Sequence, residues 1–353
     1  MADVRPFRAI RYARPSAAVT APPYDVVDDE ELALLRARDP HNIAHLTLAP
    51  DANEARELLE GWLAEGVLVR DAEPAVWFLE QEYVGPDGVA RRREGIVASL
   101  RAEPYATRAV LPHERTHVAA IEGRLRLLRA TRVQLEPIFL LYDGPAPLTR
   151  PAGQPDIVVE GTRLWRLDDA SGVEEHFAER QLLIADGHHR YETAVAFAAE
   201  DGADRLLAVL VSTSDPGLEV FPTHRVFADR PDIDPRGDAA ASVEDALAAL
   251  DASQNGCFAF VRNGEARLLH ADAGELDVDV VDRFGHDGIA YTPDREDAVE
   301  RVRSGRADCA FLLRPPRIAD VFERARRGQP LPQKTTYFYP KLVSGLLLHP
   351  LDR

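Results

Sequence analysis

The stretch Leu182-Leu183-Ile184-Ala185-Asp186-Gly187-His188-His189-Arg190-Tyr191 is the most informative part of the chain. Its apolar first half predicts a buried strand that ends at Asp186, and the residues after Gly187 predict a helix that continues through 192–200. The N-terminus of a helix offers unpaired N–H groups and positive dipole character, which together bind phosphate. A glycine at this point lets the backbone approach a ligand closely. The pattern therefore predicts a phosphate-binding strand–turn–helix.

Three side chains in the first helical turn extend this prediction. Arg190 can hold phosphate oxygens with two N–H groups at once. His189 can add a further donor, and His188 is a candidate general acid. The structural alternative is that Asp186 caps the helix and the histidines lie on the surface. Capping alone does not account for two histidines and an arginine in one turn, so we favour the functional interpretation.

Composition limits the classes of protein to consider. A chain of 353 residues suggests about two domains, and alternating strand-like and helix-like stretches suggest a mixed α/β (α+β) architecture. The formal net charge is −17, with 59 acidic and 42 basic residues, and only Lys334 and Lys341 are lysines. This composition suggests a GC-rich genome. It also suits a halophilic protein in a high-salt cytoplasm, although GC bias with an acidic surface explains it as well. We expect no binding to duplex DNA, which requires a basic face.

The number of cysteines and the hydropathy of the chain indicate in which cellular compartment the protein is expected. Cys257 and Cys309 are the two cysteines, too few for a disulfide framework or a cysteine-based metal cluster. The first residues lack an apolar signal core, and no segment approaches 18 uninterrupted apolar residues. We therefore expect a soluble, cytoplasmic protein that does not enter a membrane. The sequence does not indicate an oligomeric state.

A second motif competes with the first. Residues His113-Glu114-Arg115-Thr116-His117 match His-Glu-x-x-His, which on a helix would direct two histidines to one zinc ion with Glu114 as general base. Glu136 could be a third ligand of this zinc peptidase site. Pro112 opposes a continuous helix, and Arg115 is charged where zinc peptidases usually have an uncharged residue. We favour a loop in which Glu114 serves another site.

Other residues are weaker candidates for the site. Pro22-Pro23 enforce an extended backbone, which either packs Tyr24 in a rigid loop or presents Tyr24 and Asp25 as a pocket wall. Arg225 could bind a second phosphate, or form an ion pair in a turn. Lys334 could supply the compact point charge that arginine cannot.

The chain resembles an uncharacterised family, the domain-of-unknown-function family number 1015, almost from end to end. The motifs that carry this resemblance are Pro6-Phe7-Arg8-Ala9, Ala21-Pro22-Pro23-Tyr24-Asp25-Val26, Leu111-Pro112-His113-Glu114 followed by Thr116, Ile184-Ala185-Asp186-Gly187-His188-His189-Arg190-Tyr191, Pro222-Thr223-His224-Arg225, and Lys334-Thr335-Thr336-Tyr337-Phe338-Tyr339-Pro340-Lys341-Leu342. This resemblance implies no settled activity.

A more distant resemblance is to the ParB/sulfiredoxin superfamily, and within it to the free serine kinases. It rests on the order His113-Glu114, Arg124, Pro137-Ile138 and then the 186–190 motif, and it covers roughly residues 108–230. The resemblance implies a nucleotide-phosphate site at the strand–turn–helix, to which His113 and Arg124 would contribute. It also implies that Glu114 is the base that acts on an acceptor hydroxyl.

Together these observations predict three units and a function. The units are an N-terminal α/β segment (1–107), a ParB/sulfiredoxin-like core (108–230) and a C-terminal accessory lobe (238–353), with the charged Pro/Gly stretch 231–237 as the boundary. The expected function is nucleotide-dependent phosphoryl transfer, with ATP, ADP or CTP, to a small hydroxylated metabolite such as L-serine. Mg²⁺ is the expected ion, held by Asp186 or Asp25. The alternatives are a non-catalytic nucleotide-binding switch and a phosphohydrolase.

Overall fold

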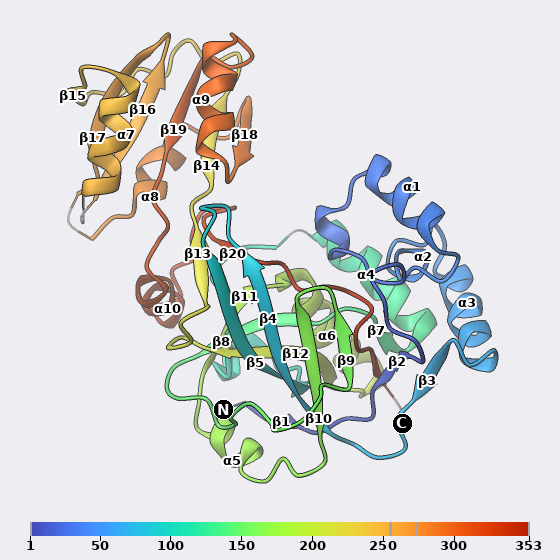
Figure 1. Ribbon diagram of the computed structural model, residues 1–353. Helices are drawn as coiled ribbons and strands as arrows, with labels where there is room; N and C mark the ends of the chain where they lie inside the picture. Colours follow the sequence, from blue (N-terminus) through green and yellow to red (C-terminus); the bar gives the residue numbers. More distant parts are fainter. Residues whose placement is uncertain (1, 117, 254–255, 273, 352–353) are drawn as a thin grey trace.

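The computed structural model describes residues 2–116, 118–253, 256–272 and 274–351. It has a large body built on a nine-stranded mixed sheet and a smaller lobe built on a six-stranded sheet (Figure 1). The expected α/β fold class is confirmed. None of the helices in these described ranges is both long enough and apolar enough to cross a membrane.

The nine strands of the large sheet follow the order β6-β11-β8-β12-β5-β4-β10-β9, and β1 pairs with β5. Their bounds are β1 Val4–Arg5, β4 Val76–Val84, β5 Ala90–Arg101, β6 Val110–Leu111, β8 Ile138–Tyr142, β9 Ile157–Val159, β10 Thr162–Leu167, β11 Leu182–Asp186 and β12 Arg205–Ser212. Strand β11 is parallel to β6, and β12 is parallel to β8, whereas the other pairs are antiparallel. The strand that leads to the predicted turn therefore lies between two sheet neighbours.

Both faces of this sheet are buried around β8 and β12, which explains why these two strands are apolar over most of their length. In β8, Leu140 belongs to the hydrophobic cluster that includes α5 and α6, while Leu141 belongs to the cluster on the other face. That second cluster includes α10 and side chains from residues 331–347. The C-terminal part of the chain thus forms one cover of the large sheet.

Helices and short strand pairs complete the large body. Their bounds are η1 Tyr24–Val26, α1 Asp29–Arg38, α2 Ala44–Thr47, α3 Ala52–Ala64, η2 Tyr105–Thr107, α4 Val118–Thr131, α5 Val173–Ala178, α6 His188–Asp201 and α10 Ile318–Arg326, with the pairs β2 Ile10–Tyr12 and β3 Leu68–Arg70, β7 Val133–Gln134 and β21 His349–Pro350, and β13 Glu219–Phe221 and β20 Tyr337–Tyr339. Helices α1, α2 and α3 form a separate layer, at the right of Figure 1, with its own core around Trp62.

The smaller lobe has the strand order β15-β17-β16-β19-β14-β18. Its elements are β14 His224–Phe227, β15 Asp238–Ala239, α7 Val243–Ala252, β16 Cys257–Arg262, β17 Glu265–His270, α8 Asp277–Asp282, β18 Ile289–Thr292, α9 Arg295–Arg303 and β19 Cys309–Leu312. Helices α7 and α9 pack on one face, and α8 contributes to the core on the other. Strand β14 precedes the expected linker 231–237 and is already part of this lobe.

The chain leaves the smaller lobe after β19 and returns to the large body through α10 (Figure 1). The backbone of Ser344 pairs with Ala21, and that of Leu348 pairs with Ile10. Residues 331–351 therefore run across the large body and end beside its N-terminal strands.

Candidate functional site

The strand–turn–helix expected around Gly187 is present. Strand β11 ends at Asp186, Gly187 has a left-handed backbone with φ of 95°, and α6 begins at His188. A Cβ atom on residue 187 would lie 2.9 Å from Ile138 Cγ2, so both the backbone angle and the space require glycine. The free N–H groups of the first turn of α6 are consequently close to the end of the sheet.

Asp186 lies between two cations. Its Oδ2 accepts a hydrogen bond from Arg190 Nη2 at 2.6 Å, and its Oδ1 contacts Lys341 Nζ. Burial alone would raise the pKa of this carboxyl, but the charges of Lys341 and Arg190 lower it to about 2. Asp186 is therefore ionised at neutral pH, and the cluster of three charges carries a net charge of +1.

Arg190 is engaged by protein atoms on two sides. Besides Asp186, its guanidinium donates to the carbonyl oxygen of Pro137, and its side chain is only 6% exposed. Burial opposes the charge, but Asp186 and Glu136 raise the pKa of Arg190 above its usual value. In this arrangement Arg190 fixes Asp186 against the start of β8.

The two neighbouring histidine rings, those of His113 and His188, are buried and neutral. His113 Nδ1 donates to the carbonyl oxygen of Ile184 at 2.6 Å, so its Nε2 accepts from Thr336 Oγ1 at 2.9 Å. The backbone N–H of His113 donates to His188 Nε2 at 3.3 Å. Burial lowers the pKa of His113 to about 4, and it lowers the pKa of His188 well below its usual value. His189 is half-buried, and its carbonyl accepts a hydrogen bond from Thr193.

Glu114 lies in the loop after β6, within electrostatic reach of both lysines and of Asp186. Its carboxylate accepts a hydrogen bond from the backbone N–H of Lys334. Burial raises the pKa of Glu114, and the charge of Lys334 offsets only part of this effect. A buried carboxylate with a raised pKa is a stronger base than an exposed one, as proton abstraction requires.

The helix that a His-Glu-x-x-His zinc site requires is not formed by residues 113–116, which have no helical structure. His117 lies outside the described residues. Both ring nitrogens of His113 are already hydrogen-bonded, and Glu136 is bonded to Arg124 rather than to this loop. The described residues contain no group of three or more His, Cys, Asp or Glu side chains that could hold a metal ion.

Arg225 connects the smaller lobe with the site. It lies in β14, is 3% exposed, and donates to the carbonyl oxygens of Thr223 and of Gln333, the latter at 3.1 Å. Burial lowers the pKa of Arg225 to about 10. Lys334 follows directly, with its side chain exposed and a positive φ of 55°. Arg225 therefore positions the turn that presents Lys334.

Arg124 is placed beside the N-terminal loop. Its Nη2 pairs with Glu136 Oε2 at 3.0 Å, and its guanidinium lies 4.0 Å from the centre of the Tyr24 ring. The backbone N–H of Tyr24 donates to Glu136 at 2.9 Å. The charge of the exposed Asp25 acts on Arg190, so this loop borders the strand–turn–helix. Tyr24 and Asp25 thus lie next to the strand–turn–helix, and their role as a pocket wall stays a prediction.

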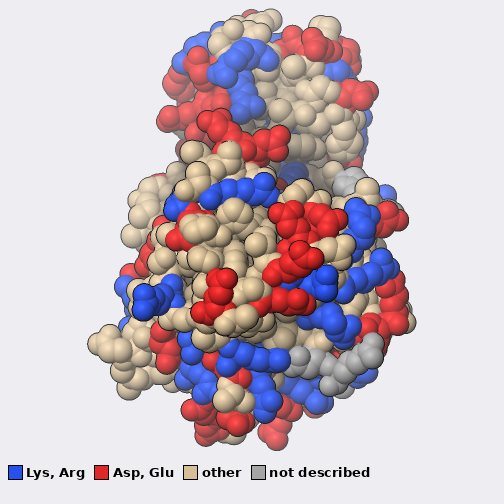
Figure 2. All heavy atoms as spheres, turned by 90° about the vertical axis from the view of Figure 1, so that its right-hand side faces the viewer, with Lys and Arg blue, Asp and Glu red and all other residues tan. Residues whose placement is uncertain are grey.

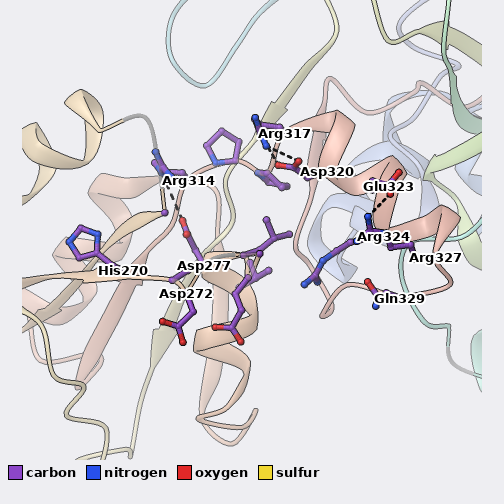
Figure 3. Close-up of a pocket in the computed structure, with 18 residues that line it drawn as sticks. His270, Asp272, Asp277, Arg314, Arg317, Asp320, Glu323, Arg324, Arg327 and Gln329 are labelled. Carbon is purple, nitrogen blue, oxygen red and sulfur yellow. Dashed lines mark hydrogen bonds and ion pairs between the residues drawn. The ribbon is translucent and has the colours of Figure 1, made fainter.

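The structure contains two large cavities. One borders Glu114, and the other lies at the junction between the smaller lobe and the large body. A cavity of about 510 Å³ is lined by Glu114, Arg115 and Thr116 on one side and by Ala325 and Gly328 on the other. A second cavity, of about 660 Å³, lies between the smaller lobe and α10 (Figure 3). The arginines in α10 and directly before and after it that line this second cavity are paired with carboxylates, namely Arg324 with Asp279, Arg317 with Asp320 and Arg327 with Glu323.

Mg²⁺ at Asp186 does not fit this arrangement. Both carboxylate oxygens already contact cations, and a divalent ion would be repelled by Lys341 and Arg190. A magnesium ion at this site would therefore depend mainly on oxygens that a ligand supplies.

The sequence of this chain is similar to known proteins. Residues 4–284 match the family model described as "Protein of unknown function (DUF1015)". The chain belongs to this family. The match includes the strand–turn–helix, Glu114 and Arg225, but it ends before the part of the DUF1015 protein that carries Lys334 and Lys341.

Individual relatives of the DUF1015 protein are distant. An ATP-dependent L-serine kinase of Staphylothermus marinus is 22% identical over 186 residues, which are 49% of this chain and 72% of that protein. A solved free serine kinase in complex with AMP is 18% identical, with a TM-score of 0.41. The match covers 67% of this chain and 89% of the kinase chain. C-terminally truncated SbnI from Staphylococcus aureus is 13% identical, with a TM-score of 0.43. That match covers 72% of this chain and 87% of the SbnI chain.

Lys341 is the site residue that sequence reasoning did not select. Its contact with Asp186 joins residues 155 positions apart, and no local pattern predicts such a pair. The available signal was composition, because Lys334 and Lys341 are the only lysines in the chain. The structure brings both of them to the carboxylates of one site.

Proposed function

We propose that the protein is a nucleotide-dependent phosphotransferase that acts on a small hydroxylated metabolite. The observation that carries this proposal is the position of Glu114, a carboxylate with a raised pKa that lies within electrostatic reach of the Asp186–Lys341 pair beside the strand–turn–helix. Phosphoryl transfer needs fixed positive charge near the phosphates and a base for the acceptor hydroxyl. The cluster around Asp186 and the N-terminus of α6 can supply the first, and Glu114 the second.

The distant kinase relative supports the same reaction class, and it makes ATP the first nucleotide and L-serine the first acceptor to test. The cavity of about 510 Å³ next to Glu114 has room for a small metabolite. A ParB/sulfiredoxin-like core is part of this proposal. Magnesium would enter with the nucleotide and neutralise phosphate oxygens, since Asp186 is already paired.

A non-catalytic nucleotide-binding switch is the second candidate, and one observation favours it. Arg225 in the smaller lobe holds the turn next to Lys334, so a ligand at the site would act on a contact between the two lobes. Such a protein would bind nucleotide and change the relative position of its lobes without transferring phosphate.

The test is a phosphoryl-transfer screen in multimolar KCl with Mg²⁺ and ATP, ADP or CTP, with hydroxylated metabolites led by L-serine. Wild type is compared with Glu114→Gln and with Glu57→Gln, which changes a glutamate whose side chain is 73% exposed. We expect a phosphorylated product in wild type and Glu57→Gln, and a rate lower by roughly 10²- to 10⁴-fold in Glu114→Gln with nucleotide binding retained.

Each other result selects a different interpretation. Nucleotide binding without turnover would favour the switch. Release of inorganic phosphate without an acceptor would indicate a phosphohydrolase. A wild type that binds no nucleotide would contradict the phosphate-binding role of the turn at Gly187.

A further inference from the structure

The two lysines of this chain lie on one segment, residues 331–341, which we call the lysine arm. Lys334 is exposed, and its backbone N–H is bonded to Glu114; Lys341 contacts Asp186 and has a side chain that is 22% exposed. The other basic residues of the chain are arginines. Because lysine presents a compact ammonium on a flexible stem, it can turn between two anions more easily than a buried guanidinium can.

Of the two cations that contact Asp186, Lys341 rather than Arg190 is the one that a ligand can reach. Arg190 is 6% exposed and is already bonded to Asp186 and Pro137. If Lys341 left Asp186, the carboxylate would still be paired with Arg190 and would not become an isolated buried charge. The surplus positive charge of the cluster is therefore available on Lys341 alone.

The two ends of the lysine arm are fixed by buried arginines from two different strands, β14 and β5. At one end Arg225 holds the carbonyl of Gln333, and at the other Arg93 donates to the carbonyls of Tyr339 and Pro340 at 3.2 and 3.0 Å. Arg93 is fully buried, and its other bonds go to Gln81.

The middle of the lysine arm is held as well. Thr336 is bonded to the ring of His113, and the backbone N–H of Leu331 donates to the carbonyl of His113 at 2.7 Å. Anchoring a backbone in this way reduces the entropy that is lost when its side chains bind a ligand. The backbone of the lysine arm is therefore anchored along its length and holds both lysine side chains at the site.

We propose that the lysine arm is a second phosphate-binding element, in which Lys341 leaves Asp186 and binds the phosphate chain of a nucleoside di- or triphosphate. This inference rests on the proposed nucleotide-dependent function. It makes Lys341, instead of Arg190, the side chain that contacts the phosphates. The N-terminus of α6 and Lys341 then contact the phosphates from two sides.

The scarcity of lysine makes a direct experiment possible on the wild-type protein. The chain is treated with an amine-acetylating reagent, alone and with saturating ATP, AMP, inorganic pyrophosphate or adenosine, and acetylation at Lys341 and Lys334 is followed by mass spectrometry. We expect ATP and pyrophosphate to slow acetylation of Lys341 several-fold, while adenosine leaves it unchanged. Unaltered acetylation of Lys341 under conditions where ATP binding is measured would overturn the inference.

Affinity measurements on variants give an independent result. We expect Lys341→Met to bind ATP and ADP about 10- to 100-fold more weakly than wild type, as for the loss of one charge-assisted hydrogen bond, with unchanged affinity for adenosine. The matched control is Arg303→Met, which removes an exposed cation on α9 in the smaller lobe. Lys341→Arg keeps a positive charge next to Asp186 and is the second variant if Lys341→Met does not fold.

The outcomes separate the inference from the proposed function. If wild type and Lys341→Met bind ATP equally, the lysine arm is not a phosphate-binding element, and the proposed function stands. If wild type binds neither nucleotide nor pyrophosphate, both are wrong.

Discussion

Asp186 and Glu114 are both partly buried carboxylates, yet their surroundings move their pKa values in opposite directions. Two cations lower the pKa of Asp186 to about 2, whereas burial with only partial compensation raises the pKa of Glu114. Sites of acid–base chemistry commonly separate neighbouring titratable groups in this way. Asp186 is suited to remain charged and to organise cations, and Glu114 is suited to exchange a proton.

The raised pKa of Glu114 predicts a pH dependence of the proposed activity. The base must be ionised, so kcat/KM should fall as the pH is lowered through a value above the ordinary glutamate range. In Lys334→Met the carboxylate loses the charge that most lowers its pKa, so the pKa of Glu114 rises further and the acidic limb of the profile moves to higher pH. A pH–rate profile of both proteins measures this shift, and Arg303→Met should show none. An unshifted limb in Lys334→Met would show that Glu114 is not the titrating group.

Gly187→Ala should destabilise the protein for two reasons. The backbone of residue 187 is left-handed, and the added Cβ atom would lie too close to the side chain of Ile138. The control is Gly153→Ala, since Gly153 has a similar φ of +97° and open space around the position of a Cβ atom. We expect a loss of about 1 kcal/mol for Gly153→Ala and roughly 2–4 kcal/mol for Gly187→Ala in the free energy of unfolding. Chemical denaturation measures both values, and equal losses would mean that the contact with Ile138 relaxes without cost.

At the scale of elements, the site is formed by a strand end, a helix start, one loop and a returning arm. The strand β11 and the helix α6 are adjacent in sequence, whereas the loop with Glu114 is about 70 residues earlier and the lysine arm is about 150 residues later. Strand β6, which precedes the loop, pairs with β11 and brings Glu114 to the turn. His113 then joins the loop to both β11 and the arm.

Thr336→Val tests whether His113 anchors the lysine arm. The substitution keeps the shape of the side chain but leaves Nε2 of the buried His113 ring without its partner. Such an unpaired group costs about 1–3 kcal/mol of unfolding free energy. We also expect weaker binding of ATP, measured by calorimetric titration. Thr213→Val, which removes a hydrogen bond from a loop, should leave ATP binding unchanged.

Local patterns in the sequence predicted the elements that are continuous in the chain. The run 182–191 showed both the strand and the start of the helix, because apolar periodicity and a glycine at the junction are local signals. The His-Glu-x-x-His match was ambiguous because it lacks such local signals. Five residues do not reveal whether a helix forms, and Pro112 was the physical clue that residues 113–116 do not form one.

Contacts over long sequence distances could not be predicted from the sequence. Arg190 was expected to hold phosphate because its side chain is chemically suited to it. Its actual neighbours, Asp186 and the Pro137 carbonyl, depend on how β8 and β11 pair. The return of the lysine arm depends on packing of the C-terminal residues across the sheet, for which no short motif exists.

At the scale of the whole molecule, buried histidines determine how acid affects stability. Burial lowers the pKa of His113, His224 and His349 to about 4 in the folded state, while the unfolded value is 6.5. Between these values the unfolded chain binds more protons than the folded one. Stability is therefore fully present above pH 6.5 and is lost as the pH falls toward 4, by at most about 1.4 kcal/mol per histidine for each pH unit.

Urea denaturation at pH 7 and pH 5 measures this loss. We expect a clear decrease in the free energy of unfolding at pH 5, and a smaller decrease in His349→Gln, in which one of these buried histidines no longer titrates. A stability that is the same at both pH values would contradict the neutral state of the buried histidines.

The net charge of −17 predicts a dependence on salt. The face shown in Figure 2 carries groups of acidic side chains next to groups of basic ones. Added KCl screens the repulsion among the excess carboxylates, and the melting temperature should rise between 0.1 and 1 M. A thermal scan at several KCl concentrations checks this expectation. A melting temperature that falls over this range would count against adaptation to high salt.

The pairing of Ser344 with Ala21 and of Leu348 with Ile10 has a consequence for synthesis on the ribosome. The large sheet, the turn at Gly187 and the loop with Glu114 all emerge before the smaller lobe is made, and the lysine arm emerges after it. A nascent chain thus exposes an unfinished phosphate site for as long as translation of the smaller lobe takes. If the proposed function is right, the site becomes competent only after the lysine arm has been synthesised, when the rest of the protein is already folded.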